Sequence, residues 1–339
     1  MRDLIVVHPD FDGVWPFAAD HFRALWPQTD FIRQGNGDQR RLGEVVQQRA
    51  NITRLVVLGT LVTLDCLRGF SALEEATFQG AAYKQSLNKE CKNFLTENSI
   101  AFYDHPSEGF WAQTVAEFAL GLTLCGLRRI PQLHHDIIHN QRAWHYEPIQ
   151  GRKIPGGRGE QFGDNPTFSN GTLCGKRVRI VGAGNIGSRY ASFASILGAD
   201  VAAWDPFTTE PSFHLAKSRQ VFHLEELMSD AEIFAPMVPL NKSTVNLVKA
   251  THINALPLGC LVVLVTRARI CDFDAIRQRV LADEISLAAD VWDHEPLSLD
   301  DPLLGRHNVI HTPHCAGRTI DANKAWAEKL AAQFKSRGK

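Results

Sequence analysis

The sequence predicts an α/β protein with two doubly wound domains, each built on a parallel sheet, and a cleft between the domains. Two observations lead to this prediction. From Lys176 onward, short apolar runs alternate with helical patterns, as in parallel sheets that are covered by helices. The chain has 339 residues, which is too long for one typical compact domain and long enough to bury a large core.

The first part of the chain contains the elements of one predicted sheet. Short apolar runs bounded by turn residues predict strands over 3–9, 54–60 and 100–104. Helical patterns lie near 16–26 and 40–50. A longer helical pattern over 114–141 is interrupted at Pro131. The stretch 147–172 is rich in Gly and Pro and has no period, so we predict a long loop whose part near 150–170 is a candidate lid, dimer arm or mobile loop.

The second part alternates more regularly. Strands are predicted, in chain order, over 177–182, 200–204, 232–236, 260–265 and 285–290. Helices are predicted between them over 186–197, near 224–229, near 251–255 and over 272–282. An amphipathic helix over 321–336 follows.

Composition excludes some classes of partner. A net charge of −1 and a pI of about 6.9 give no global reason to expect nucleic acid. The seven cysteines are scattered without a C-x-x-C pair, which indicates reduced thiols and a cytoplasmic location. The run 260–265 is too short to span a membrane, and the run 3–9 is typical of a first strand rather than a signal peptide.

Three glycines, beginning at the last residue of the predicted strand 177–182, have the spacing G-x-G-x-x-G. Gly182 would allow a tight turn, Gly184 would let the backbone approach a pyrophosphate, and Gly187 would allow close packing of helix on strand. The helix that begins near Asn185 would direct its free N–H groups at phosphates. Glycines also end strands for structural reasons alone, so the motif depends on its context.

Asp205 supplies that context, because it directly follows the next predicted strand. An acid there accepts hydrogen bonds from the ribose hydroxyls of adenosine and repels a 2′-phosphate. The turn and the acid together predict a Rossmann-like domain that binds NAD rather than NADP. The NADP alternative stays open, because Arg189 or an arginine elsewhere in the chain could reach a 2′-phosphate.

A bound dinucleotide implies hydride chemistry, which needs a carboxylate clamp and a proton shuttle. Arg267 follows the buried run 260–265, at the strand end where open sheets bind ligands. Two later segments offer the remaining candidates: Asp290, Asp293, Glu295, His311 and His314.

These segments resemble the D-isomer-specific 2-hydroxyacid dehydrogenase family, over roughly residues 50–330. The family has a G-x-G-x-x-G turn, an N-x-x-R-G segment, a D-V-F-x-x-E-P segment and a T-P-H-x-x-G segment, in that order. Here they read "GAGNIG", "LVTRA", "DVWDHEP" and "TPHCAG". "VPLNKST" is similar to the family's L-P-L-T-x-x-T turn, and "TVAEFALGL" to its V-A-E helix.

The resemblance implies a role for each catalytic candidate. Arg267 would bind the substrate carboxylate and polarise the 2-oxo group, for which a planar guanidinium is suited. His314 would be the general acid and base, and Glu295 would orient its imidazole. Asp290 would lie beside the nicotinamide.

The resemblance also implies the binding residues. The substrate carboxylate would be bound by the loop of Gly80, Ala81 and Ala82, together with Arg267. Cofactor contacts are expected from Gly182, Gly184, Asn185, Ile186, Gly187, Asp205, Pro239, Val265, Thr266, Arg267, Asp290, His314 and Gly317.

Four positions depart from the family pattern. Leu264 and Ala268 stand where the family usually has Asn and Gly, and both adjoin the arginine segment. Ala82 and Lys84 stand where Gly and Asp are common. We hypothesise that Lys84 favours a second anionic group on the substrate.

Some candidates have plainer interpretations. Arg267 could pair with Asp272 or Asp274, but its position after a buried run disfavours this. His311 is interpreted as a strand residue, and Asp293 as a solvated one. Other residues lie outside the motifs: His134, His135 and His139 on a predicted helix, and the neighbours Phe110 and Trp111. For the histidines we favour a solvated helix face over a metal site, and the aromatic pair either lines a substrate pocket or packs between domains.

The sequence thus predicts an NAD(H)-dependent oxidoreductase that interconverts a 2-oxo acid and its D-2-hydroxy acid. We expect a substrate domain of residues 1–111 plus 315–339, an NAD-binding domain of residues 112–314, and a homodimer formed through the latter. The resemblance implies a reductase of glyoxylate, hydroxypyruvate or a larger 2-oxo acid, with dehydrogenation of 3-phosphoglycerate as a further alternative. The exact substrate and the direction in the cell stay open. The alternative is an NAD(H)-responsive corepressor-like protein that binds partner peptides and shows little turnover.

Overall fold

The computed structural model describes residues 2–80, 87–105, 107, 109–140, 144 and 163–336. Its internal contacts divide the chain into two compact units. The first unit is Met1–Trp111 with Arg318–Lys339, and the second unit is Ala112–Gly317. Ala81, Ala82, Lys84 and most of the predicted loop near 150–170 lie outside the described residues.

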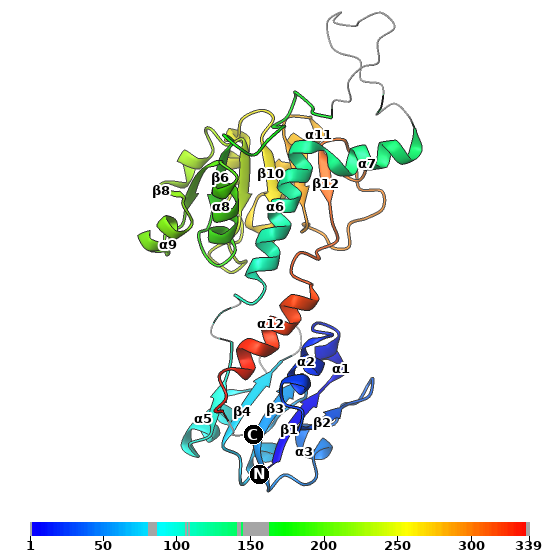
Figure 1. The fold of residues 1–339 in the computed structure, drawn as a ribbon, viewed down its shortest axis with the longest axis vertical. Coiled ribbons are helices and arrows are strands. Elements are labelled where there is room, and N and C mark those ends of the chain that lie inside the picture. The colour runs from blue at the N-terminus through cyan, green and yellow to red at the C-terminus, as the bar shows by residue number, and fades with distance from the viewer. Residues whose placement is uncertain are drawn as a thin grey trace, which may run out of the picture. The chain divides into compact units, whose positions relative to one another are not determined.

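The first unit contains a five-stranded sheet in the order β2-β1-β3-β4-β5, and every strand pair is parallel (Figure 1). The strands are β1 (Arg2–Val7), β2 (Asp30–Arg33), β3 (Ile52–Leu58), β4 (Glu75–Gln79) and β5 (Ala101–Tyr103). The helices are α1 (Pro9–Asp12), α2 (Ala18–Leu25), α3 (Leu42–Val45), α4 (Leu64–Arg68), α5 (Lys89–Glu97) and α12 (Ile320–Ala331).

Alternating side chains of the central strands create two cores in this unit. Leu4 and Val6 of β1 face a cluster that includes residues of α3, α4 and α5. Ile5 and Val7 face the opposite cluster, with residues of α2 and α12. The sheet is therefore covered on both faces, which is the doubly wound arrangement that the sequence predicts.

The second unit contains a seven-stranded parallel sheet in the order β12-β11-β10-β9-β6-β7-β8. The strands are β6 (Arg177–Val181), β7 (Asp200–Trp204), β8 (Arg219–Val221), β9 (Ile233–Pro236), β10 (Leu261–Leu264), β11 (Ser286–Ala289) and β12 (Val309–His311). Its α-helices are α6 (Ala112–Arg128), α7 (Ile130–His139), α8 (Gly187–Ile196), α9 (Glu210–Leu215), α10 (Ala250–Ala255) and α11 (Phe273–Leu281). Two short 3₁₀ helices are η2 (Leu224–Leu227) and η3 (Ala268–Ile270).

The strand order determines where a ligand binds in this unit. Counted from β6, the order is 3-2-1-4-5-6 with a seventh strand at the edge, which is the arrangement of dinucleotide-binding sheets. The direction of winding reverses between β6 and β9, so the segments after these two strands flank the expected crevice. Helices α6 and α8 pack on one face of the sheet, and α10 and α11 pack on the other.

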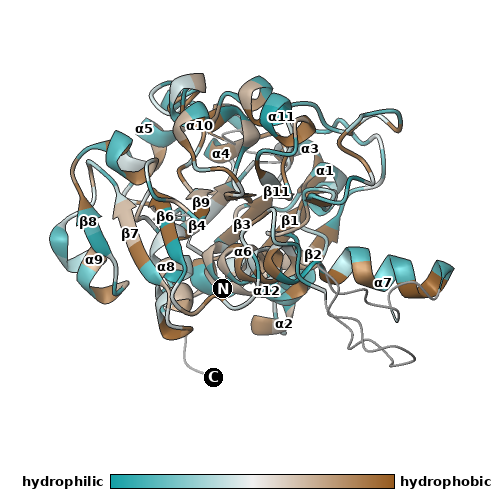
Figure 2. Cartoon of the chain, turned by 90° about the horizontal axis from the view of Figure 1, so that it is seen from above, coloured by the Kyte–Doolittle hydropathy of each residue, from teal (hydrophilic) through white to brown (hydrophobic). Residues whose placement is uncertain are grey.

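Hydropathy follows this layering, with apolar residues concentrated along the strands (Figure 2). Helix α7 is different, because it carries apolar and polar residues but none of its residues is buried (Figure 2). Within the described ranges, no helix has both the length and the apolar character needed to cross a membrane. The seven cysteines are all described, and all are free thiols.

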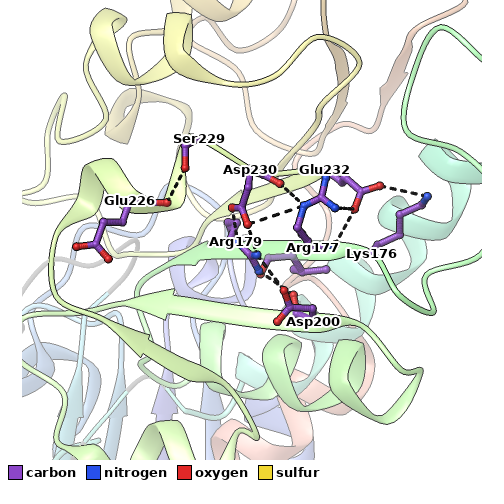
Figure 3. Close-up of polar contacts among 9 residues, drawn as sticks. Lys176, Arg177, Arg179, Asp200, Glu226, Ser229, Asp230 and Glu232 are labelled. Carbon is purple, nitrogen blue, oxygen red and sulfur yellow. Dashed lines mark hydrogen bonds and ion pairs between the residues drawn. The ribbon is translucent and has the colours of Figure 1, made fainter.

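A buried arginine ties three strands together at the amino end of the second sheet (Figure 3). Arg179 of β6 is 1% exposed, and it donates to both carboxylate oxygens of Asp230 at 2.8 and 2.6 Å. It also donates to the carboxylate of Asp200 at 3.0 Å, at the start of β7. This network lies at the amino ends of the strands, whereas the glycine turn lies at their carboxyl ends. The role of the network is therefore structural.

The structure differs from the sequence prediction in several elements. The helix predicted near 40–50 is only α3, since Gly43 and the β-branched pair Val45 and Val46 disfavour a longer helix. The helix predicted near 224–229 is the 3₁₀ helix η2. Strand β4 was not predicted, because the charged residue Glu75 made this segment look solvent-exposed. In the structure Glu75 is buried, and Arg54 of β3 pairs with the carboxylate of Glu75.

Candidate active site

The three glycines after β6 have three different environments. Gly182 has a φ of +100°, and a Cβ atom there would lie 2.7 Å from Cγ1 of Val238. A Cβ on Gly187 would lie 2.0 Å from the carbonyl oxygen of Gly182, so the start of α8 requires glycine. A Cβ on Gly184 would meet no atom within 4 Å. The protein therefore leaves the surface of the turn open at Gly184, where a pyrophosphate would approach.

Helix α8 begins at this turn and directs the N–H groups of its first turn toward it. Asn185 and Ile186 connect the open glycine to the helix. The guanidinium of Arg189 donates to the carbonyl oxygen of Asn185 at 2.6 Å, which folds this side chain back onto the turn. The turn, the open glycine and the helix terminus fit the diphosphate of a dinucleotide.

Asp205 follows β7 and is fixed beside the same turn. Its Oδ2 accepts a hydrogen bond from the backbone N–H of Ala183 at 2.8 Å. Its Oδ1 accepts from the N–H groups of Phe207 and Thr208 at 2.9 and 3.1 Å. The carboxylate is only partly buried, so it can still receive ribose hydroxyls.

His314 and Glu295 are in direct contact. Nδ1 of His314 lies 2.7 Å from Oε2 of Glu295, and the two side chains are 38% and 36% exposed. Oε1 of Glu295 accepts the backbone N–H of Trp292 at 2.9 Å, so both carboxylate oxygens are engaged. With Nδ1 bound to the carboxylate, Nε2 is the imidazole nitrogen left to exchange a proton with a ligand.

A buried carboxylate holds the segment that carries His314. Asp290 is 0% exposed and accepts hydrogen bonds from Oγ1 of Thr312, N of Cys315 and N of Ala316 at 2.6, 3.0 and 2.8 Å. His314 itself has a φ of +54°, a backbone conformation that these flanking bonds help to hold. The structure therefore gives Asp290 partners that the sequence did not indicate, and its contact with a cofactor stays a prediction.

Trp292 also anchors this segment, and sequence reasoning missed it. Its indole N–H donates to the carbonyl oxygen of Thr312 at 3.1 Å, while its backbone N–H donates to Glu295. The family pattern has Phe at this place, which has no N–H to donate. The substitution of Trp for Phe in "DVWDHEP" was the available signal.

Arg267 follows β10 and is half-buried. Its Nη1 donates to the carbonyl oxygen of Thr266 at 2.6 Å. Across the described residues it forms no ion pair with a carboxylate, and Asp272 instead caps α11 by accepting the N–H of Ala275. The departures beside Arg267 have structural reasons, since Leu264 ends the buried strand β10 and Ala268 is 2% exposed.

The other predicted cofactor residues lie at strand ends of the same unit. Val265 and Thr266 are buried after β10. Pro239 belongs to the turn after β9, where its carbonyl oxygen accepts from Oγ1 of Thr244 at 2.5 Å. Gly317 ends the second unit. Parallel strands present their carboxyl ends on one side of the sheet, so Pro239, Val265 and Thr266 lie on the same side as the glycine turn and Asp205.

The remaining candidates are placed as follows. His311 is an exposed residue of β12, in agreement with its interpretation as a strand residue. Asp293 is exposed, in agreement with its interpretation as a solvated residue, and it pairs with Arg277 at 3.3 Å. His134, His135 and His139 are exposed on α7. In the first unit, Gly80 follows β4 and lines a cavity together with Phe110 and Trp111.

Comparisons with known proteins agree with this arrangement. Residues 120–316, more than half of the chain, match the family model described as "D-isomer specific 2-hydroxyacid dehydrogenase, NAD binding domain". The chain is 30% identical to D-3-phosphoglycerate dehydrogenase of Haemophilus influenzae over 227 residues, which cover 66% of this chain and 50% of the relative. It is 30% identical to glyoxylate reductase of Thermofilum pendens over 233 residues, which cover 66% of this chain and 61% of the relative.

A third relative, D-3-phosphoglycerate dehydrogenase of Methanocaldococcus jannaschii, is 28% identical over 278 residues, covering 82% of this chain and 48% of the relative. The chain thus matches about half the length of these phosphoglycerate dehydrogenases.

Solved structures share the fold. A phosphoglycerate oxidoreductase from Rhizobium etli has a TM-score of 0.73 at 19% identity, over 96% of this chain and 92% of that one. The NAD-complexed D-isomer specific 2-hydroxyacid dehydrogenase from Lactobacillus delbrueckii ssp. bulgaricus has a TM-score of 0.69 at 15% identity, over 97% of this chain and 95% of that one. The family match, the strand order and the glycine turn lead to one conclusion: the chain belongs to the D-isomer specific 2-hydroxyacid dehydrogenases and carries their NAD-binding domain.

Proposed function

We propose that the protein is an NAD(H)-dependent oxidoreductase that interconverts a 2-oxo acid and its D-2-hydroxy acid. In this proposal the second unit binds the cofactor and the first unit binds the substrate. The contact between His314 and Glu295 is the observation that carries the proposal. A fixed carboxylate on Nδ1 leaves Nε2 to move a proton, which is the group that carbonyl reduction requires.

The residues of this chain would divide the remaining work. Nε2 of His314 would donate a proton to the 2-oxo oxygen in reduction and remove the hydroxyl proton in oxidation. Glu295 would stabilise the positively charged imidazole in between. Arg267 would hold the substrate carboxylate in a bidentate contact, for which it has no competing carboxylate among the described residues. Bound NAD(H) would supply the hydride chemistry at C2.

The binding roles stay as the resemblance implies them. We propose Gly80, whose neighbours Ala81 and Ala82 lie outside the described residues, as a backbone contact to the substrate. We propose the glycine turn and Asp205 as the contacts to the diphosphate and the adenosine ribose. The geometry that supports this is the open surface at Gly184 and the carboxylate that is fixed beside the turn.

The test is steady-state turnover of the full chain with a panel of 2-oxo acids and NADH, with NADPH in parallel and chiral analysis of the product. We expect turnover that yields the D-isomer, favours NADH and is lost in His314→Ala while NADH binding persists. An L-product, or turnover that His314→Ala retains, would contradict the proposed mechanism. Measurable NADH binding without turnover of any 2-oxo acid would instead favour the corepressor-like alternative.

We also propose that the protein forms a homodimer through the second unit. Helix α7 supports this, because none of its residues is buried and Ile137 and Ile138 are 50% and 63% exposed. The measurement is light scattering of the purified chain beside a variant that carries Ile137→Glu and Ile138→Glu. A dimer that the double variant converts to a monomer agrees with the proposal, and a monomeric parent chain contradicts it.

A further inference from the structure

The first unit holds a cavity of about 380 Å³ at the carboxyl ends of three strands. Gly80 follows β4 and His105 follows β5, whereas Trp15 follows the short helix α1 that comes after β1. Open α/β sheets bind ligands outside this edge, and sites for small molecules span roughly 300–1,000 Å³. Gly80 belongs to the predicted substrate loop, so the cavity wall includes one residue of that prediction.

Aromatic rings form much of the cavity wall. Trp15 stacks on Trp111, with ring centroids 5.4 Å apart and an interplanar angle of 21°. Phe110 meets Trp15 edge-on at 5.5 Å, and Trp326 of α12 lies 5.9 Å from Trp15. Rings at these spacings offer both faces and edges to a further planar ring.

His105 adds another ring to this wall, 4.7 Å from Phe110 and 4.9 Å from Trp326. Both of its ring nitrogens are buried without a hydrogen-bond partner. Burial lowers the pKa of His105 to about 4, so the ring is neutral at pH 7. It therefore acts as an uncharged aromatic surface and offers no positive charge to an anion.

The charged groups of the wall nearly cancel. Among the described residues that line the cavity, Lys92 is the cation and Asp104 the anion. Oδ1 of Asp104 accepts from the N–H of His105 at 2.8 Å and from Nε2 of Gln79 at 3.2 Å. A phosphate group needs several cationic or N–H donors, which these residues do not provide. The wall fits an uncharged ring better than a phosphate ester.

From these observations we propose that the cavity receives the side chain of the substrate, and that this side chain is aromatic. The inference rests on the proposed function and names its substrate class as 2-oxo acids of the arylpyruvate type. It separates this chain from the curated relatives above, which are named for D-3-phosphoglycerate and glyoxylate.

The first part of the test compares kcat/KM of the full chain for phenylpyruvate, pyruvate and 3-phosphohydroxypyruvate, each with NADH. We expect phenylpyruvate to be preferred over pyruvate by about tenfold or more, as for a bulky apolar group in an apolar pocket. A preference for pyruvate overturns the inference. A preference for 3-phosphohydroxypyruvate also overturns it and favours the hypothesis that Lys84 binds a second anionic group.

The second part changes the wall. Trp15→Ala removes the central ring, Trp15→Phe retains an aromatic one, and Trp26→Ala is the matched control. Trp26 belongs to the same unit but packs against Phe22 and Phe334, away from the cavity wall. We expect Trp15→Ala alone to lower kcat/KM for phenylpyruvate by about tenfold while that for pyruvate stays within about twofold. Equal losses for both substrates would overturn the inference.

The third part measures binding without turnover, by calorimetric titration of the full chain with 3-phenylpropanoate and with propanoate. We expect the aryl acid to bind more tightly, in the parent and in His314→Ala, and to lose this advantage in Trp15→Ala. If the aryl acid binds but no 2-oxo acid is turned over, the proposed function fails and the aryl site stands. If 2-oxo acids are turned over but the aryl acid has no advantage, the function stands and the aryl site fails.

Discussion

Nδ1 of His314 lies 2.7 Å from Oε2 of Glu295, and the other oxygen of that carboxylate is bound by the N–H of Trp292. The imidazole is thus oriented by a carboxylate that is itself fixed by the backbone. Asp290 accepts hydrogen bonds from residues on both sides of His314. The pair is therefore preorganised, and Nε2 keeps one orientation without a bound ligand.

Trp292→Phe tests the contribution of the indole N–H, because an aromatic ring is kept while the bond to Thr312 is lost. The substitution also removes the pyrrole part of the indole, so a control must share that loss. One hydrogen bond of this kind contributes about 0.5–1.5 kcal/mol. We therefore expect kcat to fall by about 2- to 10-fold with KM unchanged and with Tm close to that of the parent. The measurement is steady-state kinetics beside thermal unfolding.

Trp26→Phe is the matched control, since it makes the same exchange in the first unit, where Trp26 packs against Phe22. A change in KM without a change in kcat would show that Trp292 shapes substrate binding rather than the position of His314.

We expect the substitution of Ala for Gly to have opposite outcomes at Gly184 and at Gly187. Gly187→Ala places a Cβ 2.0 Å from a carbonyl oxygen, so we expect a lower free energy of unfolding, by about 2 kcal/mol or more. Gly184→Ala meets no protein atom, so we expect an unchanged Tm and an NADH Kd that rises by about tenfold or more.

Chemical denaturation and NADH titration of both variants provide the comparison. An unaltered NADH affinity in Gly184→Ala would mean that the diphosphate does not approach the turn at that point.

Arg179→Met tests the network at the far edge of the second sheet. The guanidinium is buried, whereas Asp200 and Asp230 are about half-exposed and can be hydrated after its loss. We expect the free energy of unfolding to fall by about 1–3 kcal/mol, with kcat/KM unchanged, since the network lies opposite the glycine turn.

The pH dependence of this variant has a defined sign. Hydrogen bonds from Arg179 lower the pKa of Asp230 in the folded protein. The pairing of Arg179 with Asp230 therefore stabilises the folded protein at neutral pH. This stabilisation is lost as the pH falls through the lowered pKa of Asp230. Arg179→Met should lose less stability than the parent between pH 5 and the acid limit of folding. A free energy of unfolding that falls more steeply with decreasing pH in Arg179→Met than in the parent would contradict this account of the Arg179–Asp230 pair.

His105→Phe tests the buried neutral histidine of the cavity. In the folded protein the pKa of His105 is about 4, below the value of about 6.5 in an unfolded chain. Between these values the unfolded state binds more protons, so the parent loses stability as the pH falls from about 6.5 toward 4. His105→Phe should lose less over this range and should match or exceed the parent at pH 7, because two unpaired buried nitrogens are removed.

Urea unfolding at several pH values gives the slope of the unfolding free energy against pH. The control is His134→Phe, because His134 is exposed on α7. Equal slopes in the parent and in His105→Phe would refute the account of His105.

The fold was predictable where periodicity and turn chemistry agree. The alternation after Lys176 and the glycines after β6 located five of the seven strands of the second sheet, because buried parallel strands are short apolar runs. The three-residue edge strands β8 and β12 were too short to be predicted. Strand β4 was missed since Glu75 is polar in sequence but neutralised by Arg54, a pairing between two strands that no local pattern reveals. Long-range partners of this kind are set by topology.

The same limit applies to the candidate site. The spacing of the motifs identified Arg267, Glu295 and His314 as candidates, but it did not indicate that Asp290 and Trp292 bind the segment around His314. Those bonds join residues about twenty positions apart through backbone groups, which carry no sequence signal. For the aromatic cavity, the sequence indicated Phe110 and Trp111 as possible pocket residues, but it did not indicate Trp15 and Trp326, which only the fold brings beside them.

The central claim is that His314 moves the proton while Glu295 holds the imidazole of His314 in place. The most direct measurement is kcat of Glu295→Gln with the preferred 2-oxo acid and saturating NADH, beside the NADH Kd of the same variant. The account predicts a kcat lower by about 100-fold or more, with the NADH Kd unchanged, because the amide keeps the shape but not the charge that orients and stabilises the imidazole. A kcat within about twofold of the parent would contradict it.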